Sequence, residues 1–149
     1  MPLVLLHAQI NLSIEKNRSN NVNYIKVHIA NSSDEDIWFW YRNKSMADNY
    51  SRITFRYYFG NQCLGTHESI YRTKEMTSNY KIDHFKLKKG ASEDFLYNID
   101  QIQTIVNASK AAKIKITCFI YVTGDSTGKN YRINKTIEFP LLPRELKNQ

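Results

Sequence analysis

This sequence has little cysteine, proline or glycine. Only two Cys, three Pro and five Gly occur among its 149 residues. Two cysteines, Cys63 and Cys118, are too few for a disulfide framework or a zinc cage. The scarcity of proline and glycine excludes a collagen-like or linker-rich chain. Whether the two cysteines pair with each other is left open by the sequence.

No apolar run is long enough to cross a bilayer, so we expect no membrane span. The first eight residues look superficially like the end of a secretion signal, but no basic segment precedes them and the apolar run is short. Alternation of apolar and polar residues continues from Val4 to Glu15, which predicts a half-buried strand instead. If a native signal has been removed, the periplasm or the outside of the cell is the expected location; otherwise it is the cytoplasm.

Motifs of catalysis are missing as well. There is no nucleophile elbow, no phosphate-binding glycine loop and no dinucleotide fingerprint. The histidines lack the close pairing of metal ligands; they are His7, His28, His67 and His84. Asp34, Glu35 and Asp36 lack the spacing of a calcium loop and predict a turn. We therefore expect a protein that is not an enzyme and that binds no metal or cofactor.

A catalytic cysteine is the remaining enzymatic alternative, since Cys–His pairs can form nucleophiles across long sequence separations. Cys118 is predicted to point inward from an apolar strand, where a thiol is an inert small hydrophobe. Cys63 lies near a hairpin and is expected to be exposed, but no basic setting surrounds it.

Aromatic residues and alternating strands are abundant. Aromatics make up 13% of the chain, and the alternation predicts eight or nine strands joined by short turns, which favours an antiparallel arrangement. One short helix is expected over Asp100–Ser109 from apolar residues three and four apart. We predict an all-β, antiparallel sandwich in a single domain, residues 1–149, with 144–149 as a loose basic tail. The strands are expected near 4–15, 23–31, 37–41, 53–59, 63–72, 80–87, 93–98, 113–122 and 131–139.

The layout resembles the immunoglobulin and fibronectin type III class of sandwich. Three features carry the resemblance: inward Cys118 on the penultimate strand, Trp38 and Trp40 on an early central strand, and the turn at Phe85–Gly90 that precedes a strand. The resemblance implies an immunoglobulin-like sandwich of about eight strands. No cysteine lies on the expected second strand, Ile25–Ile29, so the inter-sheet disulfide of antibody domains is not implied.

The segment Ile37–Tyr41 is aromatic on both faces. Trp38 and Trp40 alternate with Ile37, Phe39 and Tyr41, and both sets cannot meet one core. One set therefore meets solvent, a covering loop or helix, or a partner, and exposed aromatic faces mark binding sites. Outward aromatics on other strands would extend the patch, and basic residues interleave with it. The candidate partner-binding residues are Trp38, Trp40, Tyr58, Arg56, Arg42 and Tyr121; further candidates are Tyr24, Phe119, Lys44, Arg52, Lys113 and Lys115.

A formal net charge of +7 favours acidic partners. The hypothesis that fits best is a non-catalytic protein-binding module, a small inhibitor or immunity-type protein that neutralises an acidic toxin or effector. The alternative is a carbohydrate-binding or cell-surface accessory module, because tryptophan and tyrosine stack on sugar rings. Nucleic acid ranks lower, since the glycine and aromatic signature of RNA-binding sheets is absent. The oligomeric state is left open.

Overall fold

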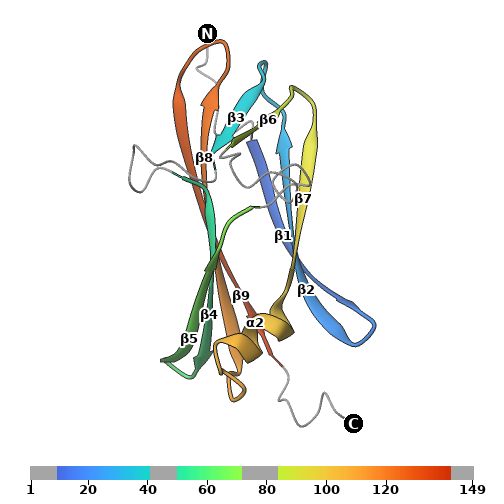
Figure 1. Cartoon of the computed structure of the whole chain (residues 1–149), viewed down its shortest axis with the longest axis vertical. Helices are drawn as coiled ribbons and strands as arrows, with labels where there is room; N and C mark the ends of the chain where they lie inside the picture. Colours follow the sequence, from blue (N-terminus) through green and yellow to red (C-terminus); the bar gives the residue numbers. More distant parts are fainter. Residues whose placement is uncertain (1–9, 41–49, 72–83, 142–149) are drawn as a thin grey trace.

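A computed structural model describes residues 10–40, 50–71 and 84–141, which form nine strands and one helix in two antiparallel sheets (Figure 1). The first sheet has the order β1-β2-β7. Its strands are β1 (Ile10–Ser19), β2 (Val22–Asn31) and β7 (Ser92–Asn98). Over these described residues, the prediction of a mostly antiparallel, all-β architecture with one short helix is confirmed.

The second sheet is built around the long strand β8 (Lys113–Gly124). Strand β9 pairs with β8 along its length, so β4 and β3 share the opposite edge of β8, one after the other. Strand β5 extends this sheet beyond β4, and β6 extends it beyond β3. The bounds of the remaining strands are β3 (Ile37–Trp40), β4 (Arg52–Phe59), β5 (Gln62–Ser69), β6 (His84–Leu87) and β9 (Asn130–Pro140).

One buried serine closes the break between β3 and β4. Ser51 is fully buried, and its Oγ accepts a hydrogen bond from the Tyr121 amide (2.7 Å) and donates to the Tyr121 carbonyl (3.2 Å). Its own amide donates to the Trp40 carbonyl. A hydroxyl can both donate and accept, so one side chain satisfies both backbone groups of Tyr121 where the ladder is interrupted.

The two sheets face each other across one apolar core. The rings of Phe39 and Phe95 lie 6.3 Å apart across the interface, and those of Phe55 and Tyr97 lie 5.4 Å apart. The alternation predicted these inward positions because strand side chains point to opposite faces in turn. The fully buried strand residues include Ile25, Val27, Ile29, Ile37, Phe39, Ile53, Phe55, Ile114, Ile116, Cys118, Ile120 and Val122.

Two lysines join the sheets along the β1–β9 side. Lys16 Nζ donates to the Pro140 carbonyl and Lys135 Nζ donates to the Leu12 carbonyl, each at 3.0 Å. Near α2 (Ile99–Ile105), the buried Tyr57 hydroxyl donates to the Ile99 carbonyl at 2.7 Å. Polar bonds thus supplement the apolar core.

The helix is shorter than the predicted Asp100–Ser109. Helix α2 is N-capped by Asn98, which accepts from the Gln101 amide, and it ends at Ile105. Asn107 has a left-handed φ of 57°, a conformation that stops helical hydrogen bonding. No helix in the described ranges is long and apolar enough to cross a membrane.

Several expected segments lie outside the described residues. These are the predicted strand residues at 4–9, most of the 43–51 loop, the start of the 80–87 strand and the C-terminal tail. Not every apolar strand residue is buried. Phe59 is 60% exposed at the end of β4. Ile133 and Ile137 are only partly buried, because β9 is an edge strand.

Candidate binding face

Most of the predicted partner-binding residues share the outward-facing side of the second sheet, here called the outer face. The five placed by the structure are Trp38, Trp40, Arg56, Tyr58 and Tyr121. The sixth, Arg42, lies outside the described residues. The core is filled by the other side of the same strands, including Ile37 and Phe39. The sequence left open which side of Ile37–Tyr41 faces outward, and the structure decides it.

Strand register establishes that these residues share one face. Trp38 lies opposite Thr123, and Arg56 lies opposite Lys115. Thr123 and Lys115 are an even number of residues apart on β8, so their side chains leave the same side of the sheet. At the rise of an antiparallel strand, this separation corresponds to about 27 Å. The outer face therefore extends along most of β8.

Aromatic and cationic side chains are matched across the strands of this face. Each of four aromatic rings has a lysine or arginine directly opposite it in register, with the charged group within 6 Å of the ring centroid, the range of a cation–π contact. The pairs are Trp38 with Lys86 (4.7 Å), Tyr121 with Arg132 (5.9 Å), Phe119 with Arg52 (4.5 Å) and Tyr58 with Lys113 (5.7 Å).

The sequence did not single out Lys86, Arg132 or His84 as members of this face. Alternation places each on the outward side of its strand, but register alone shows which aromatic ring each one meets. The alternation of residues on β6 and β9 indicates on which side of the sheet these side chains lie. It does not show that β6 lies beside β3 and β9 beside β8, and this strand order decides which rings they contact.

Trp38 and Trp40 are held in place at one end of the outer face. The His84 ring lies between them, with centroids 5.0 Å from Trp38 and 4.9 Å from Trp40. The indole Nε1 of Trp38 donates to Asp125 Oδ1 (2.8 Å), and that of Trp40 donates to Thr123 Oγ1 (3.0 Å). Both tryptophans are half-buried and outward. Phe39, and neither tryptophan, takes the core position on this strand.

Tyr121 was expected to be an exposed member of the patch, and this was wrong. It lies on the outward side of β8 but is only 3% exposed, with Arg132 over its ring. Alternation predicts the side of the sheet and not what covers a residue there. Tyr121 therefore lies under Arg132 and contributes little accessible surface to the outer face.

The opposite surface of the molecule, the outward side of the first sheet, has a different character. Glu15 lies opposite Lys26, and the His28 ring contacts the Asp94 carboxylate. Tyr24 belongs to this side, so it does not extend the aromatic patch as expected. This surface is mixed, because Leu96, 66% exposed, lies among its charged and polar side chains.

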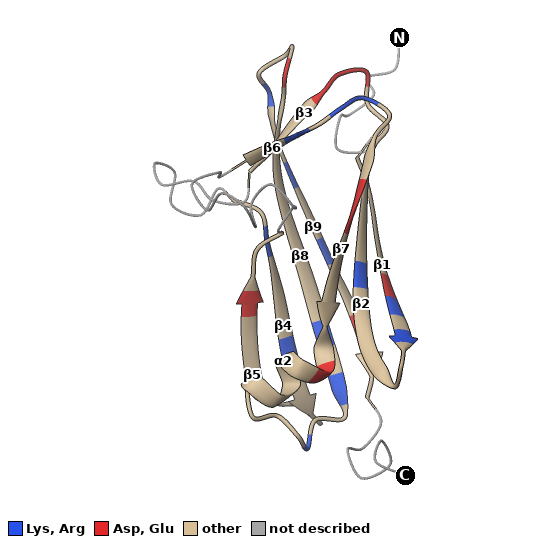
Figure 2. Cartoon of the chain, turned by 45° about the vertical axis from the view of Figure 1, so that its right-hand side comes forward, with Lys and Arg blue, Asp and Glu red and all other residues tan. Residues whose placement is uncertain are grey.

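On the outer face, lysine and arginine outnumber aspartate and glutamate. Figure 2 marks the lysine and arginine positions along β4, β8 and β9 in blue. Three cations there have carboxylate partners: Lys86 with Asp125 (3.7 Å), Arg52 with Glu68 (3.9 Å) and Lys113 with Glu138 (3.9 Å). The cations are Arg52, Arg56, Lys86, Lys113, Lys115 and Arg132, against the carboxylates Glu68, Asp125 and Glu138.

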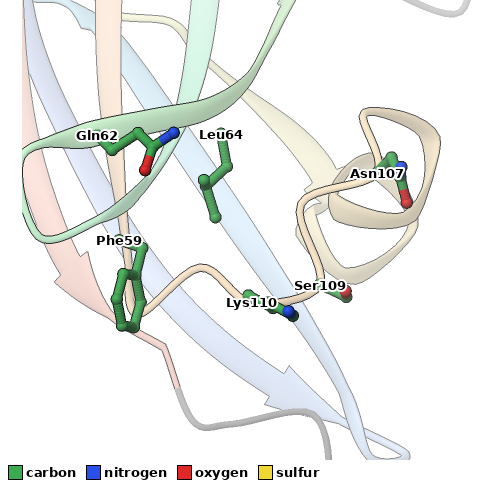
Figure 3. Close-up of a pocket in the computed structure, with 6 residues that line it drawn as sticks. All are labelled: Phe59, Gln62, Leu64, Asn107, Ser109 and Lys110. Atoms are coloured by element: carbon green, nitrogen blue, oxygen red, sulfur yellow. The ribbon is translucent and has the colours of Figure 1, made fainter.

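A pocket of about 400 Å³ lies beside the end of α2, away from the outer face (Figure 3). Phe59 and Leu64 supply its apolar lining, and polar residues complete it: Gln62, Asn107, Ser109 and Lys110. The volume is in the range of small-molecule sites. Only one lining residue, Lys110, carries a titratable side chain, so the pocket holds no acid–base pair.

Both cysteines are free thiols. Burial raises the pKa of the Cys118 thiol to about 11, so it stays protonated near neutral pH, as expected of an inward residue. Cys63 is exposed on β5, and its Sγ contacts the Gly65 carbonyl (3.6 Å) and the Thr66 hydroxyl (3.5 Å). Within the described ranges, no cluster of three or more His, Cys, Asp or Glu residues could hold a metal ion.

The carboxylates of Asp34–Asp36 serve the turns, as the sequence predicted. Glu35 accepts hydrogen bonds from the amides of Ser126 (2.8 Å) and Thr127 (3.1 Å), and Asp36 accepts from the Lys89 amide (2.8 Å). Desolvation raises the pKa of Glu35, but the hydrogen bonds from Thr127 and Ser126 outweigh it and leave the pKa below its ordinary value. An ionised Glu35 therefore fastens the β8–β9 turn to β3.

No protein-family model and no curated protein sequence matches this chain. Among solved structures, the chain is similar to the Northeast Structural Genomics Consortium target SoR45, with a TM-score of 0.53 and 7% identity over 92% of this chain and 90% of that one. A protein from Archaeoglobus fulgidus matches with a TM-score of 0.36 and 8% identity over 89% and 96%. The first similarity shows a shared fold and nothing about activity.

Proposed function

We propose that this chain is a non-catalytic protein-binding module that neutralises an acidic partner protein, such as a toxin or effector, through the outer face. The observation that carries the proposal is the series of cross-strand aromatic–cation pairs along β8. Tryptophan, tyrosine and arginine are the residues that dominate binding energy at protein interfaces. The positive excess selects for negatively charged partners and speeds their approach.

The core does not need these aromatics. Ile37 and Phe39 already fill the inner side of β3, and Phe55 and Tyr57 fill that of β4. Aromatic side chains on a solvent side contribute less to folding than the same side chains in a core. Their concentration on one surface supports a role in recognition.

The strand order also supports the immunoglobulin-like architecture as part of this proposal. In such sandwiches one sheet contains strands A, B and E and the other contains C, F and G. Here β1, β2 and β7 match the first set in order and pairing, and β4, β8 and β9 match the second. The addition of β6 to β3 is a departure from that pattern.

Affinity capture from the native host, with purified wild-type protein and a Trp38→Ala, Trp40→Ala variant, tests the function. A tryptophan that acts as an interface hot spot contributes about 2 kcal/mol or more, so losing both is expected to weaken binding by at least the effect of one, about 30-fold. A Tyr24→Ala variant removes an aromatic side chain from the opposite surface and is the matched control. It is expected to bind like wild type.

The proposal fails if the captured partner binds the double variant as tightly as wild type. It also fails if the Tyr24→Ala control loses as much affinity, because that result moves the interface to the first sheet. Circular dichroism of each variant verifies that the fold persists.

Carbohydrate binding is a second candidate, favoured by the half-exposed rings of Trp38, His84 and Trp40 at one end of the outer face. Adjacent fixed indoles provide apolar faces for a pyranose ring. A glycan array followed by tryptophan fluorescence tests it: quenching by a defined glycan supports this candidate, and an array without hits rejects it.

A further inference from the structure

Two cationic residues lie in register on β4 and β8, toward the end of the outer face that is farther from the tryptophans. Arg56 on β4 lies directly opposite Lys115 on β8. Like charges directly opposite one another destabilise an antiparallel pair. On the far side of Lys115, the residue in register is Glu138, but its carboxylate forms an ion pair with Lys113 at 3.9 Å. The arrangement thus works against the stability of the free protein.

Arg56 and Lys115 differ from the neighbouring cations in their lack of a carboxylate partner among the described residues. Lys86, Arg52 and Lys113 each have a carboxylate within 4 Å. Among the residues that the structure describes, no salt bridge involves Arg56 or Lys115. Both side chains are half-buried, so their charges are less well hydrated than those of fully exposed residues.

Groups that can donate hydrogen bonds lie in the rows before and after the pair, while Glu138 lies beside Lys115 on β9. The next row of the sheet holds Thr54 opposite Thr117, and the row on the other side holds Tyr58. Directly opposite cross-strand residues have Cβ atoms about 5 Å apart, which lets two long side chains reach one small anion. The guanidinium can bind a carboxylate through two parallel hydrogen bonds, and the ammonium adds a second positive charge.

We propose that Arg56 and Lys115 form a subsite for one carboxylate, an aspartate or glutamate side chain of the acidic partner. This inference rests on the proposed function and names the group that this part of the outer face recognises. The bound carboxylate would cancel the repulsion between the two cations. Part of the stability that the free protein forgoes is therefore recovered in the complex.

The proposal predicts opposite effects of one substitution on stability and on binding. Arg56→Gln and Lys115→Gln each relieve the repulsion, so each raises the melting temperature of the free protein by about 1–3 °C. With a short poly-L-glutamate peptide as the probe, titrated at low salt and followed by NMR amide shifts, each weakens binding about five-fold. Lys26→Gln, on the opposite surface, makes the same charge change and leaves binding as in wild type.

Three results would overturn the subsite: no shift of the β4 and β8 amides with the peptide, equal weakening by Lys26→Gln, or a lower melting temperature of both variants. The last result would show that the cations support the fold. The proposed function is judged separately, by capture with the Trp38→Ala, Trp40→Ala variant. If that variant loses the partner while Arg56→Gln and Lys115→Gln keep it, the function stands and the subsite fails.

Discussion

Ser51 shows how one small side chain can hold a sheet together. The chain leaves β3 and returns as β4, and the edge of β8 between them would carry unpaired backbone groups. Ser51 fills that gap by bonding to both the amide and the carbonyl of Tyr121 while fully buried. Unpaired backbone groups in such a place are costly, so the hydroxyl is a structural requirement.

We expect Ser51→Ala to lower the free energy of unfolding by about 1–3 kcal/mol, because it leaves buried polar groups of Tyr121 without partners. Urea denaturation of the two proteins measures the difference. Ser13→Ala, at an exposed position of β1, is the matched control and is expected to change stability by less than about 0.5 kcal/mol. Equal effects of the two substitutions would contradict the structural role of Ser51.

At the scale of elements, the end of α2 packs closely on β5. A Cβ added to Gly65 would lie 2.7 Å from Val106 Cγ2 and 2.9 Å from the Val106 carbonyl oxygen. Backbone cannot move away as easily as the end of a flexible side chain. Gly65 is therefore needed for the approach of the helix end to the sheet, and not for an unusual backbone conformation.

Gly65→Ala is expected to destabilise the protein by about 1–3 kcal/mol, as overpacking does. Faster hydrogen exchange of the α2 amides should accompany the loss, since the added methyl group pushes the helix end away from β5. Thr66→Ala, next in sequence and outward, is the control. A Gly65→Ala variant as stable as wild type, with unchanged hydrogen exchange in α2, would contradict the close packing of Val106 on Gly65.

How much the sequence could predict differs between elements. The alternation in β2 and β8 gave both their extent and their inward residues, because each has an apolar side facing one core. In Ile37–Trp40 both sides are aromatic, so the pattern could not tell core from outer face. The end of α2 was missed because Asn107 adopts a left-handed conformation that apolar spacing does not encode.

Most of the aromatic residues of the outer face could be predicted from the sequence, but only some of its charged residues could. Trp38 and Tyr58 were found from parity, but the contacts of Lys86 and Arg132 depend on strand order, which lies beyond local pattern. The burial of Tyr121 could not be predicted from the sequence either. Which residues cover an outward side chain is decided by tertiary packing.

The whole molecule has two unlike surfaces. The outward side of the first sheet mixes charged and polar side chains with the exposed Leu96, while the outer face of the second sheet combines cation–π pairs with an excess of positive charge. If the proposed function holds, the formal net charge of +7 draws acidic partners from a distance, and the asymmetry between the surfaces selects the side on which they bind.

Zero-length cross-linking of the complex between this protein and its captured partner tests whether the outer face binds acidic groups of that partner. A carbodiimide joins lysine amines to carboxylates that touch them, so it reports both the surface and the acidic chemistry. We expect Lys86, Lys113 and Lys115 on the outer face to be joined to aspartate or glutamate residues of the partner. Cross-links confined to Lys26 and the rest of the first sheet would contradict it.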